Sequence, residues 1–280
     1  MLTVLEIIRR TTDFFASKGI ETPRLDAELL LAHTLGMKRM QLYLQFERPM
    51  SDAELEKLRP LVRRRGAREP LQHIVGDLEF ANVVIKTDRR ALIPRQETEE
   101  LVEHVARALT TPPTRIADLG TGSGAIALAL ATHFPEAMVT AAEISPEAAA
   151  LARENVSGSA AAARVTIVEG HWRDVLAGAE FDVIVSNPPY LSEEEVAEAQ
   201  PEVREHEPHG ALIAANSGMS ALEEIISLAP AALVPGGLLA LETGIDQHQY
   251  LLGVAERAGF RVRRSLQDLS GRDRFLLLTL

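Results

Sequence analysis

The chain has 280 residues, 46% of them hydrophobic and 25% charged, and its formal net charge is −11. This length suits one α/β domain of roughly 200 residues together with a smaller domain. Because cysteine is absent, disulfides and cysteine-bound metals are excluded, and the cytoplasm is the expected location. No apolar run reaches the ~18 residues of a membrane span, so no membrane association is expected. The acidic balance argues against extended nucleic-acid binding, which usually requires a basic surface.

The N-terminal part has the pattern of a small helical bundle. Apolar residues recur at helical spacing from residue 4 to residue 12. Thr22-Pro23 predicts the start of a second helix, and Gly36 predicts its end. The capping box Ser51-Asp52-Ala53-Glu54 predicts a third helix. Residues 1–74 are therefore expected to form a helical domain.

Residues 75–93 change character and predict a β-hairpin that links two domains. Over residues 94–280, strands alternate with helices, which predicts a doubly wound α/β domain. The expected strands are residues 116–119, 137–142, 165–168, 183–186, 238–242 and 275–279. The expected helices are residues 97–109, 124–133, 146–155, 219–233 and 247–258. Ligands of such sheets bind at the carboxyl ends of the strands.

A glycine-rich turn, Gly120-Thr121-Gly122-Ser123-Gly124, follows the first of these strands. Glycine lets a ligand approach the backbone closely, and the following helix offers free N–H groups. Glu143 ends the next strand, 23 residues after Gly120, where a carboxylate can accept both hydroxyl hydrogens of a ribose. A tight turn without a ligand is the alternative. The pairing of turn and carboxylate favours a bound nucleoside.

Two cofactors fit this pattern. A dinucleotide would use Gly120-x-Gly122-x-x-Ala125, and S-adenosylmethionine would use Gly120-x-Gly122-x-Gly124. Asp118 would repel a pyrophosphate but would suit the methionine ammonium, directly or through water, which favours S-adenosylmethionine. Trp172, the only tryptophan, follows the third strand, where an adenine ring can lie against it. Its alternative role is packing as a half-buried side chain.

The fourth strand ends in Asn187-Pro188-Pro189-Tyr190. The prolines stiffen the loop and remove N–H groups, so it presents acceptors. The Asn187 side-chain oxygen and the Pro188 carbonyl can hold the two hydrogens of an –NH2 group, while Tyr190 offers a flat surface. Such bonds push electron density onto a weakly nucleophilic nitrogen and orient it toward a sulfonium methyl. We therefore predict methyl transfer to a planar amide or amine nitrogen, with Asn187, Pro188 and Tyr190 as catalytic residues. A rigid turn is the alternative.

Two other clusters are weaker candidates. His206-x-x-His209 lacks further ligands, so no metal site is expected. The basic run Arg63-Arg64-Arg65 with Arg68 is either a solvated helix end that suits the helix dipole, or a contact for a protein or RNA.

Several segments together resemble the HemK/PrmC family of release factor glutamine N5-methyltransferases, over essentially the whole chain. They are Gly76-Asp77-Leu78-Glu79-Phe80, Leu92-Ile93-Pro94-Arg95-Gln96-Glu97-Thr98-Glu99, the turn from Asp118 to Ala127, Asn187-Pro188-Pro189-Tyr190, and Asp268-Leu269-Ser270-Gly271-Arg272-Asp273-Arg274. Two positions depart from the family pattern: Glu143 stands where aspartate is more frequent, and Gln96 replaces a proline.

The resemblance implies methylation of the glutamine in the Gly-Gly-Gln motif of bacterial class 1 release factors, with S-adenosylhomocysteine as the second product. It implies a class I (Rossmann-like) methyltransferase fold, whose seven-stranded sheet ends in an antiparallel strand. By motif, the cofactor would contact Gly120, Thr121, Gly122, Ser123, Gly124, Glu143, Trp172 and Asn187. The glutamine would lie on Asn187, Pro188, Pro189 and Tyr190. Arg95 is expected to contribute to substrate binding, lining the methionine end of the cofactor or the nearby wall. The helical bundle is expected to dock the release factor, and the protein is expected to be a monomer.

Three other functions fit the sequence less well. An adenine-N6 nucleic-acid methyltransferase would use the same loop but should carry a basic target-recognition region. A nucleotide-dependent oxidoreductase has no use for the Asn-Pro-Pro-Tyr loop. A non-catalytic module would not need both the loop and the cofactor residues intact.

Overall fold

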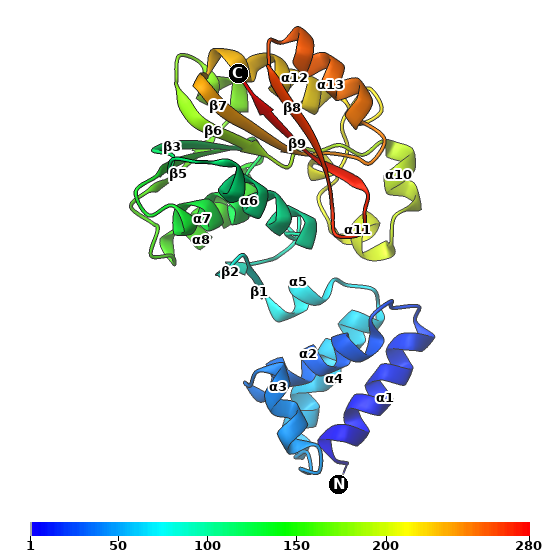
Figure 1. The fold of residues 1–280 in the computed structure, drawn as a ribbon. Coiled ribbons are helices and arrows are strands. Elements are labelled where there is room, and N and C mark those ends of the chain that lie inside the picture. Colours follow the sequence, from blue (N-terminus) through cyan, green and yellow to red (C-terminus); the bar gives the residue numbers. More distant parts are fainter. Residues whose placement is uncertain (1) are drawn as a thin grey trace. The chain divides into compact units, whose positions relative to one another are not determined.

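The computed structural model describes residues 2–280, which form two compact units, each with its own hydrophobic core (Figure 1). The first unit contains the described residues up to Asp77 and also Gln200–His206. The second contains Leu78–Ala199 and Glu207–Leu280. The sequence analysis did not anticipate that a segment from the C-terminal half packs with the N-terminal unit.

The first unit is a bundle of helices around one apolar core. Its helices are α1 (Val4–Ser17), α2 (Pro23–Leu35), α3 (Arg39–Leu42), α4 (Asp52–Gly66), α5 (Leu71–Val75) and α11 (Pro201–His206), with a 3-10 turn at Tyr43–Gln45. The capping box before α4 is confirmed, since Ser51 and Glu54 each bind the other's backbone N–H. Gly36 ends α2 in the left-handed conformation, as expected. Thr22 precedes α2, but its side chain forms no cap hydrogen bond with the helix; its hydroxyl donates to Asp26 Oδ1.

The basic run at the end of α4 is used inside the first unit. Arg65 is only 6% exposed, and it donates to Asp26 Oδ2 at 2.7 Å and to Glu202 Oε1 at 2.7 Å. Arg68 donates to both Glu202 oxygens, at 2.8 and 2.6 Å. The prediction of a solvated helix end is therefore wrong for Arg65, which is buried and binds α11 to the bundle through Glu202.

We expect Glu202→Gln to lower the free energy of unfolding of the first unit by about 1–3 kcal/mol, because two arginines lose a charged acceptor. Thermal or denaturant unfolding of the full chain measures the change. Glu205→Gln in the same helix is the matched control: Glu205 is exposed and pairs with its exposed neighbour Arg204, and a change within about 0.5 kcal/mol is expected. Equal stability of the two variants would contradict the role of Glu202.

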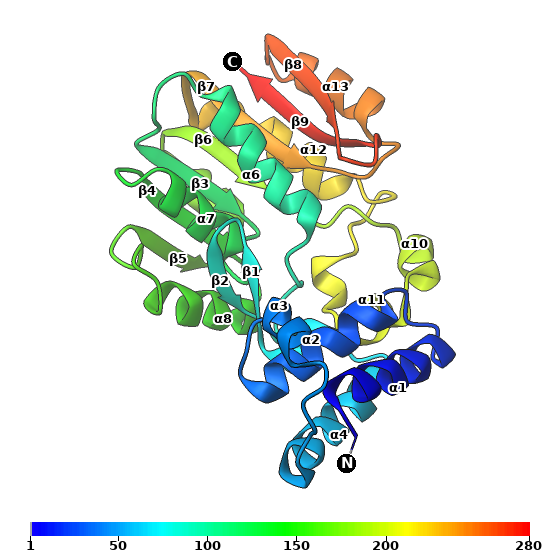
Figure 2. The same cartoon turned by 60° about the horizontal axis from the view of Figure 1, so that its bottom comes forward.

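The second unit is built on a seven-stranded sheet with the order β5-β4-β3-β6-β7-β9-β8 (Figure 2). The strands are β3 (Arg115–Leu119), β4 (Met138–Glu143), β5 (Val165–Glu169), β6 (Phe181–Ser186), β7 (Leu233–Glu242), β8 (Val262–Gln267) and β9 (Asp273–Thr279). Only β9 runs against its neighbours, so the antiparallel last strand is confirmed. The strand list from periodicity missed β8, because this edge strand is polar and mostly exposed.

Helices cover both faces of this sheet, which confirms the doubly wound fold. Figure 1 shows α6 (Gln96–Ala108), α7 (Ala125–His133) and α8 (Pro146–Ser157) on one face, where they share one core. On the other face, α9 (Trp172–Leu176), α12 (Ser220–Leu228) and α13 (His248–Arg257) share a second core. The expected helix 219–233 is too long, because Leu233 already begins β7.

The remaining elements of the second unit are short. The expected hairpin is present as β1 (Asp77–Phe80) and β2 (Val83–Lys86). Helix α10 (Glu193–Glu198) and 3-10 turns at His209–Ala211 and Ala229–Ala231 complete the list. Among residues 2–280, none of the helices has both the length and the apolar character needed to cross a membrane.

Candidate active site

The glycine-rich turn lies between β3 and α7. Gly120 and Gly122 have φ of +72° and +57°, a region that favours glycine. A Cβ atom built on either residue would meet no other atom within 4 Å. The N–H groups of Gly120 and Thr121 both donate to the Ala142 carbonyl at 2.9 Å, which ties the turn to β4. The space in front of these two glycines is therefore open to a ligand.

Asp118 supports this turn from within. It is completely buried, and its Oδ2 accepts from Thr121 Oγ1 at 2.5 Å and from the Ala127 N–H at 3.1 Å. Burial raises the pKa of its carboxyl to about 7. Its Oδ1 has no hydrogen-bond partner among the described residues. The predicted contact with a methionine ammonium thus rests on Oδ1 and stays a prediction.

Glu143 ends β4 beside the turn, as the sequence spacing suggested. Its carboxylate accepts from the Gly122 N–H at 2.8 Å and from the Ser145 N–H at 2.9 Å, one on each oxygen. Each oxygen has a second lone pair, so the group can still accept two ribose hydroxyls. Trp172 begins α9 after β5; it is half-buried, and its indole N–H has no partner within the structure's described part. These donors and acceptors fit a nucleoside cofactor.

The Asn-Pro-Pro-Tyr loop follows β6, which lies between β3 and β7 at the centre of the sheet. The Asn187 side-chain amide donates from Nδ2 to Thr98 Oγ1 at 3.0 Å. The amide oxygen Oδ1 is consequently turned away from Thr98 and can act as an acceptor. Pro188 is buried and lacks an N–H, so it contributes only its carbonyl to the loop.

Tyr190 is fixed by its hydroxyl, which donates to Glu242 Oε1 at 3.1 Å. Glu242 ends β7, is 1% exposed, and accepts from Thr98 Oγ1 on its other oxygen at 2.7 Å. Burial raises the pKa of Glu242 to about 7 and also raises the pKa of Tyr190. The Arg274 guanidinium lies 5.9 Å from the Tyr190 ring centroid. Sequence reasoning missed Thr98 and Glu242 as site residues.

The backbone after the loop is braced by a second segment. The Tyr190 carbonyl accepts from Gln247 Nε2 at 2.9 Å, and Leu191 forms a parallel bridge with Ile213. A Cβ atom on Gly218 would lie only 2.1 Å from the Tyr190 carbonyl oxygen. This close approach requires glycine at position 218, where the segment packs directly against the end of the loop.

Arg95 is anchored by an acid that the sequence analysis overlooked. Its Nη2 donates to both oxygens of Glu207, at 2.8 and 2.7 Å. Glu207 is 5% exposed, and burial raises its pKa despite the guanidinium. The substrate-binding role of Arg95 stays a prediction. No group of three or more histidine, aspartate or glutamate side chains in residues 2–280 is arranged to hold a metal.

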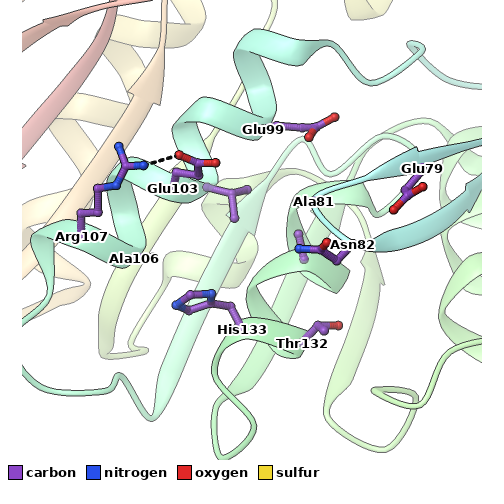
Figure 3. Close-up of a pocket in the computed structure, with 11 residues that line it drawn as sticks. Glu79, Ala81, Asn82, Glu99, Glu103, Ala106, Arg107, Thr132 and His133 are labelled. Atoms are coloured by element: carbon purple, nitrogen blue, oxygen red, sulfur yellow. Dashed lines mark hydrogen bonds and ion pairs between the residues drawn. The ribbon is translucent and has the colours of Figure 1, made fainter.

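A cavity of about 960 Å³ lies elsewhere on the second unit (Figure 3). It is lined by residues of the β1–β2 hairpin, α6 and α7, among them Glu79, Glu99, Glu103 and His133. His133 ends α7, whereas the glycine turn precedes the start of that helix. This cavity is therefore separate from the carboxyl ends of the strands, where the candidate site lies.

The buried acid Glu242 predicts a pH-dependent stability. The pKa of Glu242 is raised from 4.5 to about 7. Between these two values the folded state holds a proton that the unfolded state has released, so the free energy of unfolding falls as pH rises toward and through 7. Relative to wild type, Glu242→Gln should gain up to about 3 kcal/mol of stability between pH 5 and pH 8. Denaturant unfolding at several pH values measures the difference.

Glu54→Gln is the control for that experiment. Arg48 and the capping bonds lower the pKa of Glu54 to about 2, so its titration lies outside the pH range used. Its stability difference from wild type should stay constant from pH 5 to pH 8. A constant difference for Glu242→Gln as well would show that Glu242 does not titrate in this range.

Comparisons with known proteins agree with this geometry. Residues 6–76 match the family model of the PrmC N-terminal domain, and residues 96–203 match that of the methyltransferase small domain. The release factor glutamine methyltransferase of Geobacter sulfurreducens is 42% identical over 272 residues, covering 97% of this chain and 95% of the relative. The Escherichia coli enzyme of the same name is 39% identical, covering 92% of each chain.

Solved structures of other proteins have a fold similar to that of this chain. A methyltransferase from Pyrococcus furiosus superposes with a TM-score of 0.53 at 20% identity, covering 70% of this chain and 87% of that one. The hMettl16 catalytic domain, solved with an RNA hairpin, gives a TM-score of 0.55 at 16% identity, covering 82% and 81%. On the strength of its near-full-length relatives, the chain belongs to the family of release factor glutamine methyltransferases.

Proposed function

We propose that this protein transfers the methyl group of S-adenosylmethionine to the side-chain amide nitrogen N5 of the glutamine in the Gly-Gly-Gln motif of class 1 release factors. The observation that carries the proposal is the orientation of Asn187, whose amide nitrogen binds Thr98 and whose oxygen is thereby left to accept. The family relationship supports the choice of glutamine and of release factors.

The cofactor residues would work as a set. Bound S-adenosylmethionine supplies an electrophilic methyl group on a sulfonium sulfur. Gly120 and Gly122 leave room for it, Glu143 would accept the ribose hydroxyls, and Trp172 would lie against the adenine. Thr121, Ser123 and Gly124 complete the turn, and the buried, unpartnered Oδ1 of Asp118 would accept from the methionine ammonium, directly or through water.

The substrate glutamine would lie on the loop. Asn187 Oδ1 and the Pro188 carbonyl would accept the two amide hydrogens, while Pro189 and Tyr190 would bound the plane of the amide. Two acceptors raise the electron density on the nitrogen and align it with the methyl carbon. The N–C bond forms as the S–C bond breaks, and the nitrogen then loses a proton to solvent, so no strong base is needed.

The test is methyl transfer from labelled S-adenosylmethionine to an intact release factor. The matched control is the same release factor with Gly-Gly-Gln changed to Gly-Gly-Ala. We expect label only in the first. Equal labelling of both would refute glutamine as the acceptor, and labelling of DNA or RNA in its place would favour the adenine-N6 alternative.

The N-terminal unit is proposed to dock the release factor. Its support is the match of residues 6–76 to a domain of this family, together with a groove of about 350 Å³ between α1 and α4. Leu2, Phe14, Leu55 and Val62 are among the apolar side chains that line this groove. Val62→Asp should raise KM for intact release factor without changing KM for a short Gly-Gly-Gln peptide; an unchanged KM for both would refute docking there. A monomeric state and a cytoplasmic location remain predictions.

A further inference from the structure

A chain of three hydrogen bonds runs behind the Asn-Pro-Pro-Tyr loop. Asn187 Nδ2 lies 3.0 Å from Thr98 Oγ1, and Thr98 Oγ1 lies 2.7 Å from Glu242 Oε2. The other oxygen of Glu242 lies 3.1 Å from the Tyr190 hydroxyl. Thr98 and Glu242 are 4% and 1% exposed, so water does not compete for these bonds. One buried carboxylate thus connects to both of the side chains that would contact the substrate amide.

The direction of each bond follows from the donors available. An ionised carboxylate only accepts, so Glu242 takes the Thr98 hydroxyl hydrogen on one oxygen and the Tyr190 hydrogen on the other. Thr98 has a single hydrogen and has already donated it. Its oxygen can then only accept from Asn187, which must present its NH2 group.

This direction decides which end of the Asn187 amide faces the substrate. If the amide were flipped, its oxygen would face the Thr98 oxygen with no hydrogen between them. The flip loses the Asn187–Thr98 hydrogen bond and leaves two acceptors in contact in a buried site, which is unfavourable. The flipped amide would also present NH2 to a substrate that itself offers NH2. The chain of bonds therefore selects the one orientation that accepts.

We propose that Thr98 and Glu242 are positioning residues, which hold the Asn187 amide oxygen and the Tyr190 ring where the methyl-accepting nitrogen is bound. This inference rests on the proposed function. Neither residue need touch the substrate or the cofactor. They act through Asn187 and Tyr190. Their hydrogen bonds join α6, which carries Thr98, and the end of β7, which carries Glu242, to this loop.

The ionisation of Glu242 gives the proposal a pH signature. The titratable and charged groups that influence it are Tyr190 from the loop, Arg274 from β9 and Glu97 from α6. When Glu242 is protonated, its O–H can donate a hydrogen bond to Thr98 Oγ1, so the Thr98 hydroxyl hydrogen is free to be donated to Asn187 and both amide orientations become satisfied. Turnover is therefore expected to fall as pH drops below about 7, and this limb should disappear in Glu242→Gln.

The decisive variants are Thr98→Val, which keeps the shape but removes the hydroxyl, and Thr98→Ser, which restores it. Thr98→Val should lower kcat about 10- to 100-fold, with little change in the Kd for S-adenosylmethionine measured by calorimetry. Thr98→Ser should recover kcat to within about threefold of wild type. Wild-type kcat in Thr98→Val, or equal defects in both variants, would overturn the proposal.

A second readout does not depend on activity. In wild type, the Asn187 side-chain NH2 should give a single slowly exchanging pair of resonances by NMR, assigned by its loss in Asn187→Ala. In Thr98→Val this pair should broaden or exchange faster; an unchanged pair would contradict the proposal, even if no methylation were detected. If wild type methylated no glutamine but these resonances behaved as expected, the proposed function would fail and the positioning role would stand.

Discussion

Asn187→Ala is expected to lower kcat for methyl transfer by about 10³-fold, while the affinity for S-adenosylmethionine changes by less than about fivefold. The reason is the position of the amide. Its nitrogen is committed to Thr98 at 3.0 Å, so its oxygen is the side-chain acceptor that would polarise the substrate nitrogen. Removing it leaves only the Pro188 carbonyl, and the nitrogen is neither activated nor aligned.

A second variant, Asn187→Asp, tests the contact with Thr98 separately from the contact with the substrate. Aspartate keeps an acceptor toward the substrate but turns a second acceptor toward Thr98, whose hydrogen is already donated to Glu242. An intermediate loss of kcat is therefore expected. Single-turnover methylation of release factor, with cofactor binding followed by calorimetry, separates the two effects. Wild-type turnover in the alanine variant would refute the two-acceptor mechanism.

Most helices and central strands were predictable, because their apolar residues recur at the spacing, or in the unbroken run, that is typical of the element they form. The central strands are apolar on both faces, and α7 is apolar on all sides, so burial on both sides could be read from the sequence. Strand β8 lies at the sheet edge with Arg263, Arg264 and Ser265 exposed, and an edge strand held mainly by backbone bonds leaves no such pattern. The attachment of α11 to the first unit depends on Glu202 meeting Arg65 across 137 positions.

The residues of the candidate site also divide into those that local sequence predicts and those that only the fold brings together. The turn from Gly120 to Gly124, Glu143 and Asn187 could be predicted as site residues from the sequence, because each lies at the end of a strand. Thr98 and Glu242 are 144 positions apart, and only the three-dimensional arrangement brings them together behind the loop. An acid at the end of an apolar strand was a usable signal for Glu143, and Glu242 ends β7 in the same way.

Burial explains why these two acids differ. Glu143 is 8% exposed and uses both oxygens to hold backbone N–H groups at the rim of the open turn. Glu242 is 1% exposed and accepts from two hydroxyl donors, Thr98 and Tyr190. The first would bind a ligand in the proposed site, and the second would hold side chains in place. We infer that position along the strand identifies a functional acid, whereas its partners determine the role.

Glu143→Ala is accordingly expected to raise the Kd for S-adenosylmethionine by about 100-fold, with a smaller effect on kcat at saturating cofactor. Two ribose hydroxyls would lose a charged acceptor, at about 1.5–3 kcal/mol per bond, and each 1.4 kcal/mol is a tenfold change in Kd. The Gly122 and Ser145 N–H groups would also lose their acceptor, which loosens the turn. Glu143→Asp, one methylene shorter, should lose less than about tenfold, since it keeps the carboxylate.

Glu147→Ala is the matched control, because Glu147 is an exposed carboxylate four positions further along the chain that accepts from the Ser145 hydroxyl. Its Kd should stay within about twofold of wild type. Calorimetric titration with S-adenosylmethionine and with S-adenosylhomocysteine measures all three variants. Because both ligands carry the same ribose, Glu143→Ala should weaken them equally. A loss confined to S-adenosylmethionine would move the carboxylate's role from the ribose to the sulfonium, and an unchanged Kd would remove Glu143 from the cofactor site.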